Sequence, residues 1–160
     1  FSDEKFLLME KADEDRIPKK VMRMFMCQYL LSKTYKDMFD ENKILSAYSD
    51  ETERFEAHHI IPLGTVKKVG ESTKKLRDDE KNICNSPLNF VYITKKANKE
   101  ISDESLKDYV QKINAEAKAK LHITAYTNSD IPQDQVKQIL RERYDFLKGD
   151  IRERISTLLS

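Results

Sequence analysis

Glycine and proline are concentrated in one part of this chain, and their placement limits what it can fold into. The sequence has only three glycines and four prolines, and four of these seven residues fall within one window of 26 residues: Pro62, Gly64, Gly70 and Pro87. Both residue types interrupt regular structure and mark turns and loops. We therefore predict helices on both sides of one irregular centre, and the scarcity of both residues excludes collagen-like and elastic chains.

The flanking segments carry helical patterns of apolar residues. Only Arg23 and Gln28 are polar between residues 21 and 31, so this stretch predicts a buried helix; it is too short to cross a membrane. Apolar residues at helical spacing recur further along the chain. The predicted helices cover residues 21–38, 41–53, 103–121 and 133–159, and Gly149 predicts a kink or break in the last of them.

Two short stretches in the centre have β character. FEAHHII, residues 55–61, ends at Pro62, and NFVYIT, residues 89–94, is dominated by aromatic and β-branched side chains. Residues 95–101 then begin a helix. The predicted class is α+β, mainly α: a helical scaffold around a small β-β-α unit.

We predict one domain that spans the whole chain. Its predicted parts are N-terminal helices over 1–54, the β-β-α core over 55–101 with a loop insertion at 62–88, and C-terminal helices over 102–160.

The cysteines indicate a reducing compartment. Cys27 and Cys84 lie far apart and neither belongs to a Cys-x-x-Cys pair, which argues against a zinc knuckle and a disulfide framework. We therefore expect a cytoplasmic location. The first residue is Phe1 rather than Met and no signal sequence follows, so we expect the domain to be excised from a longer protein.

His58 and His59 are adjacent and are two of only three histidines in the chain. In a regular strand neighbouring side chains point to opposite faces, whereas at a bend or bulge both can approach one site. Such a pair is either functional or structural, buried with the aliphatic residues that follow it. Asn89 heads the second strand and Asn98 lies nine residues later, so one asparagine can buttress a loop while the other faces the histidines.

These positions resemble the HNH nucleases, which have the ββα-metal or His-Me finger fold. The family pattern is Asp/His-His-x-x-Pro, an Asn that opens a strand, and a His or Asn nine residues further on; here it reads HHIIP and NFVYITKKAN, an H-N-N variant. More loosely, the segments ISDESLKDYV, LHI, DIP and FLKGDIRERI resemble C-terminal HNH domains of GmrSD-type modification-dependent restriction enzymes and of other anti-phage systems.

The resemblance implies a role for each matching residue. His59 would be the general base that takes a proton from the attacking water, and Asn89 would tie the loop and orient it. His58 and Asn98 would be ligands of Mg²⁺ or Mn²⁺, with other divalent metals also suited to the imidazole. Glu56, two residues before His58, is a candidate extra ligand or a partner for a histidine.

The charge distribution bears on DNA as the partner. The net charge is only +1, with 29 basic and 28 acidic residues, but nine Lys and Arg face four acids between residues 67 and 99. No aromatic residues alternate with these lysines, so we expect contacts to the duplex backbone rather than base stacking. The candidate phosphate contacts are Lys95, Lys96 and Lys99 beside Asn98, and Lys67 and Lys68 in the insertion.

The resemblance also implies partners and leaves alternatives open. It implies an N-terminal ParB-like or other targeting domain in the full-length protein and no membrane partner, and dimerisation would suit a double-strand cut. The chain is predicted to be a metal-dependent DNA endonuclease in restriction or anti-phage defence. The alternatives are an inactive DNA- or protein-binding module built on an HNH relic, and a ribonuclease or toxin that uses the same finger on RNA.

Overall fold

The structure is a computed structural model of the whole chain. It describes residues 19–34, 36–40, 42, 45, 54–66, 72–79, 82–101, 104–123 and 131–159. Lys67 and Lys68 lie outside these ranges, and so does the predicted helix over 41–53 apart from Asn42 and Leu45, neither of which is helical.

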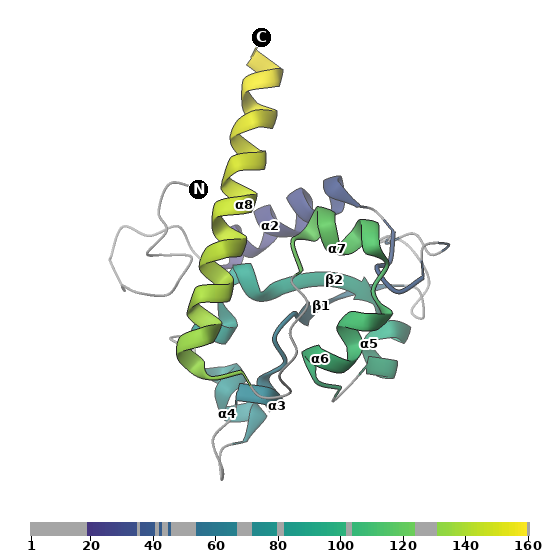
Figure 1. Cartoon of the computed structure of the whole chain (residues 1–160), viewed down its shortest axis with the longest axis vertical. Helices are drawn as coiled ribbons and strands as arrows, with labels where there is room; N and C mark the ends of the chain where they lie inside the picture. The colour runs from purple at the N-terminus through teal and green to yellow at the C-terminus, as the bar shows by residue number, and fades with distance from the viewer. Residues whose placement is uncertain are drawn as a thin grey trace.

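Within the described ranges, short and long helices surround a two-stranded sheet, as Figure 1 shows. The prediction of a mainly α member of the α+β class is therefore confirmed. The elements in chain order are α2 (Lys19–Lys33), β1 (Phe55–His59), α3 (Leu63–Val66), α4 (Thr73–Asp78), the 3₁₀ turns η1 (Ile83–Asn85) and η2 (Pro87–Asn89), β2 (Phe90–Thr94), α5 (Lys95–Ile101), α6 (Leu106–Tyr109), the 3₁₀ turn η3 (Val110–Lys112), α7 (Ala115–Leu121) and α8 (Gln133–Leu159).

The two strands are antiparallel and pair without a bulge. Five consecutive pairs run from Phe55 opposite Thr94 to His59 opposite Phe90. Because β1 is regular through its last residue, the side chains of His58 and His59 point to opposite faces of the sheet. A bulge that would bring both imidazoles to one face is absent from this strand.

Helix α2 packs against β2 and η2 and is shorter than predicted. It buries Met22, Met26 and Leu30 on one face, and it ends at Lys33 rather than near residue 38. The reason lies just beyond its end, where the buried carboxylate of Asp37 accepts hydrogen bonds from the backbone of Phe39 and Asp40 and from Thr94 N at 2.6 Å. Asp37 therefore turns the chain and satisfies the end of β2.

The predicted helix over 103–121 is divided in two. Ile113 is extended, and Asn114 starts a new helix by accepting hydrogen bonds from the backbone of Glu116 and Ala117. Asparagine is a strong helix N-cap, so its side chain stops one helix and begins the next.

Helix α8 is continuous, so the predicted break at Gly149 is wrong. Leu147 and Ile151 on either side of the glycine are both buried in the core, and this packing holds the helix through it. The C-terminal part of α8 extends beyond the other elements in Figure 1. Its last residues, Leu158 and Leu159, are exposed.

The described part of the insertion, 62–66, 72–79 and 82–88, is more helical than predicted, since α3, α4, η1 and most of η2 lie in it. In the described ranges no helix combines the length and the apolar character needed to cross a membrane.

Candidate active site

His58 and Asn98 meet where β1 packs against α5. Thr94 ends β2 and its hydroxyl accepts a hydrogen bond from Ala97 N, so α5 starts at once and places Asn98 over β1. Asn98 Nδ2 donates to Glu56 Oε2 at 2.8 Å, and its Oδ1 lies 2.9 Å from His58 Nδ1. Because the carboxylate fixes which end of the amide faces it, His58 Nδ1 carries the proton and donates to Asn98.

His58 is held neutral in this arrangement. Burial lowers the pKa of its imidazole, and the hydrogen bond with Asn98 opposes the shift only in part. The ring of Tyr109 lies edge-on to it, with ring centroids 5.5 Å apart. The other ring nitrogen, Nε2, is buried and has no hydrogen-bond partner in the described part of the chain.

The imidazole nitrogen and the amide oxygen are donor types that a divalent cation accepts. Two neighbouring ligands of an octahedral ion, each about 2.1 Å from the metal, lie about 3 Å apart, and His58 Nδ1 and Asn98 Oδ1 are 2.9 Å apart. A metal ligand must be the unprotonated nitrogen, so binding would displace the proton that Nδ1 donates. The carboxylate of Glu56 is in hydrogen-bond contact with Asn98.

The described residues contain no group of three or more His, Cys, Asp and Glu side chains that could hold a metal. An imidazole and an amide oxygen, with one carboxylate beside them, would leave other coordination positions to substrate and water.

His59 lies on the opposite face of β1, half-buried beside Phe90. The two ring centroids are 4.4 Å apart, and His59 Nε2 lies 3.3 Å from Asn85 Oδ1. Burial lowers the pKa of His59 to about 4, and the contact with Asn85 opposes this shift. The positive charges of Arg77 and Arg23, and of His58 when it is protonated, add to it. His59 is therefore neutral at pH 7 and has a lone pair that can accept a proton.

Asn85 fixes which nitrogen of His59 carries that lone pair. Its amide nitrogen donates to the carbonyl oxygens of Leu76 at 2.7 Å, Asp79 at 2.9 Å and Arg77 at 3.3 Å, and its side chain is buried. With Nδ2 committed to these carbonyls, Oδ1 must face His59 and accept from Nε2–H. Nδ1 of His59 is then the basic nitrogen.

Asn85 was not among the predicted site residues. It lies four residues before Asn89 in a loop, where no periodicity marks a buried face. The one available signal is its place in Asn-Ser-Pro, because asparagine before a proline turn commonly binds neighbouring backbone groups.

Asn89 is fully buried and links two parts of the loop. Its Oδ1 accepts from Ile61 N at 2.9 Å, and its Nδ2 donates to Cys84 O at 2.9 Å and Ile61 O at 3.2 Å. These contacts tie the chain directly after His59 to the turn before β2. The side-chain contact to the His59 ring comes from Asn85 instead.

Three of the five predicted phosphate-binding lysines lie on described residues, all on α5 with Asn98. Lys99 is exposed, Lys96 is exposed and paired with Glu100 at 3.8 Å, and Lys95 is half-buried. The structure therefore places these lysines on the same short helix as the His58 partner.

One comparison with known proteins gives a match. A family model described as "GmrSD restriction endonucleases, C-terminal domain" matches residues 2–148. The matched region contains the described elements from α2 to the first half of α8, including both strands and α5. No curated protein and no solved structure matches the chain.

Proposed function

The chain belongs to the family of GmrSD restriction endonuclease C-terminal domains, and from this we propose that it is a metal-dependent endonuclease domain that hydrolyses phosphodiester bonds in DNA. The observation that supports the proposal most is that two adjacent neutral imidazoles at the end of β1 are each held by an asparagine amide. His59 is held by Asn85, and His58 is held by Asn98.

His59 acts as the general base in this proposal. Its Nδ1 takes a proton from the water that attacks phosphorus, while Asn85 keeps Nε2 protonated and the ring in place. Asn89 binds Ile61 and Cys84, which lie near the two ends of the segment between β1 and β2. The base therefore keeps a fixed position relative to β2.

His58 and Asn98 would hold Mg²⁺ or Mn²⁺, with Glu56 as a third ligand or as the group that orients Asn98. When bound, such an ion supplies a Lewis acid that polarises the phosphate and stabilises the charge on the leaving oxygen. In-line hydrolysis needs a base and a Lewis acid on opposite sides of phosphorus.

The lysines beside this site would contact the DNA backbone. Lys95, Lys96 and Lys99 lie on α5, and Lys67 and Lys68 belong to the insertion outside the described residues. Backbone contacts position the duplex without reading its sequence. In the same proposal, recognition of particular DNA belongs to another domain of the full-length protein, of the ParB-like or another targeting class.

The test is plasmid nicking with Mg²⁺ or Mn²⁺ by the chain and by His59→Ala. We expect the substitution to abolish nicking and a chelator to do the same. His122→Asn is a matched control, because His122 caps α7 in the left-handed conformation, which asparagine tolerates. The control should cleave like the parent chain. Equal nicking by His59→Ala and the parent, in chelator, would rule the proposal out.

The same assay separates the two alternatives. An inactive relic would bind DNA without turnover under every metal condition. A ribonuclease would cleave RNA at nearly the same rate when plasmid is added as a competitor. Added RNA would strongly reduce its nicking of plasmid.

A further inference from the structure

Arg23 reaches the His59 side of the sheet from α2. Its guanidinium carbon lies 4.8 Å from the centroid of the Phe90 ring, and Nη2 donates a long hydrogen bond of 3.4 Å to Asn85 O. Phe90 and Asn85 both contact the imidazole of His59. Arg23 therefore contacts two residues that themselves contact the proposed base, and its side chain is exposed.

Arg77 approaches the same place from α4. Its carbonyl oxygen accepts a hydrogen bond from Asn85 Nδ2 at 3.3 Å, which anchors the end of α4 to the residue that holds His59. The side chain of Arg77 is exposed. The positive charges of both arginines contribute to lowering the pKa of the His59 imidazole.

Neither arginine has a carboxylate partner within the described ranges. This sets them apart from Arg154 and Lys33, which share Asp150, and from the three lysines on α5, α7 and η3 that pair with glutamates. Two uncompensated guanidinium groups beside one neutral imidazole form a positive surface that lacks an anion.

We propose that Arg23 and Arg77 bind a phosphate of the DNA backbone beside His59. The inference rests on the proposed nuclease function, and it adds a phosphate subsite on the face of the sheet opposite the α5 lysines. The planar guanidinium matches two phosphate oxygens at once and remains charged at any working pH. Stacking on Phe90 holds the Arg23 group in advance, which reduces the entropy lost on binding.

The experiment measures binding of a short fluorescent duplex by anisotropy over a series of KCl concentrations, in chelator so that no strand is cut. The chains compared are the parent, Arg23→Gln, Arg77→Gln and the double variant. Arg152→Gln is the matched control, since Arg152 is an exposed arginine on α8. We expect the double variant to reduce the slope of log K against log salt by about 0.9, the value for one lost phosphate contact. The control should keep the parent slope.

Arg77→Gln removes a charge without an expected loss of folding. The structure gives the Arg77 side chain no hydrogen bond within the described residues, so this variant should keep the parent melting temperature. Arg23→Lys is the second control, because it keeps the charge and loses the fit to phosphate and to Phe90. Parent slopes in both glutamine variants would overturn the inference.

The outcomes also separate this inference from the proposed function. If the parent chain cleaves DNA and the slopes do not change, the phosphate site is wrong and the nuclease proposal stands. If the slopes fall and the parent chain cleaves nothing under any metal, the phosphate site stands and the nuclease proposal fails.

Discussion

At the scale of single residues, three asparagine amides organise this site. Asn98 joins Glu56 to His58, and Asn85 joins three backbone carbonyls to His59. An amide has a donor and an acceptor at fixed positions, so once one end is committed the other selects the tautomer of a neighbouring imidazole. Asn89 uses the same property on backbone groups alone, where it ties the loop.

Asn85→Ala should therefore affect both activity and stability. We expect the cleavage rate to fall about 10- to 100-fold, the usual cost of removing a residue that orients an active-site imidazole. The buried carbonyls that lose their donor should lower the free energy of unfolding by about 1–3 kcal/mol. Nicking assays and urea unfolding measure the two effects.

Asn82→Ala is the control for that variant. Asn82 lies in the same loop and its side chain accepts from Cys84 N, with no contact to His59. It should cost stability and leave the rate per folded molecule unchanged. Equal rate losses in the two variants would show that Asn85 has no specific effect on the base.

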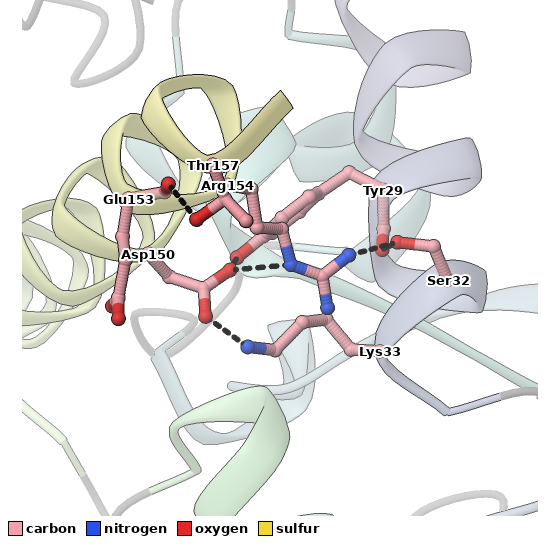
Figure 2. Close-up of polar contacts among 7 residues, drawn as sticks. All are labelled: Tyr29, Ser32, Lys33, Asp150, Glu153, Arg154 and Thr157. Carbon is pink, nitrogen blue, oxygen red and sulfur yellow. Dashed lines mark hydrogen bonds and ion pairs between the residues drawn. The ribbon is translucent and has the colours of Figure 1, made fainter. Parts of the chain in front are cut away.

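At the scale of elements, a polar cluster joins α2 to α8 (Figure 2). The carboxylate of Asp150 accepts from the Tyr29 hydroxyl and from Lys33 Nζ, and lies 3.3 Å from Arg154 Nε. Arg154 also donates to Ser32 Oγ at 3.0 Å. Burial acts to raise the pKa of Asp150, but the hydrogen bonds from Lys33 and Tyr29 outweigh it, so the pKa is lowered.

Asp150→Asn should loosen the contact between these helices. We expect a loss of about 1–2 kcal/mol, since hydrogen bonds to a charged group are worth more than neutral ones but this carboxylate is partly exposed. The folded chain binds the Asp150 proton less tightly than the unfolded chain, so the stabilisation is present above about pH 4 and is lost as pH falls through and below that value. Urea unfolding at neutral and acid pH measures this difference.

Asp145→Asn serves as the control, because Asp145 is an exposed aspartate on the same helix. It should change stability little at any pH. A loss in Asp150→Asn that stays constant down to pH 2 would contradict the role given to the carboxylate charge.

The continuity of α8 gives a stabilising substitution. Gly149 lies inside the helix, and a Cβ atom placed on it meets nothing within 4 Å. Gly149→Ala should raise the free energy of unfolding by about 0.5–1 kcal/mol, because alanine loses less backbone entropy in a helix. Thermal unfolding measures the change, and a lowered melting temperature would indicate that the glycine has another role.

At the scale of the whole molecule, acidic and basic residues balance to +1. The basic excess lies in the centre of the chain, from residue 67 to 99, and Arg23 adds to it from α2. Affinity for DNA comes largely from neutralised phosphates, so a small local excess gives weak binding.

We predict that this chain alone binds duplex DNA with a Kd of about 10⁻⁴–10⁻⁶ M at physiological salt and loses affinity steeply as salt rises. Titration of a labelled duplex at several KCl concentrations tests this, with a duplex of unrelated sequence as the control. Nanomolar binding that ignores salt, or a strong preference for one of the two sequences, would contradict it.

The sequence by itself determined the class of the fold and identified four residues of the candidate site. Apolar periodicity located α2 and α8, and β-branched and aromatic residues located β2. The spacing of His58, His59, Asn89 and Asn98 indicated the HNH nucleases, and segments further along the chain indicated the GmrSD type, which the match over residues 2–148 confirmed. The signals for the helices and the strand are local, because each depends on residues a few positions apart.

Only the tertiary structure decided what surrounds those residues. Asn85, Arg23 and Arg77 come from a 3₁₀ turn, α2 and α4, and no sequence spacing brings them to His59. The end of α2 depends on a hydrogen bond that the Asp37 carboxylate accepts from the backbone N–H of Thr94, 57 positions away. Helix α8 runs through Gly149 because the core packs on both sides of it. Contacts between distant segments form only when the chain is folded, so they override local preferences that the sequence expresses.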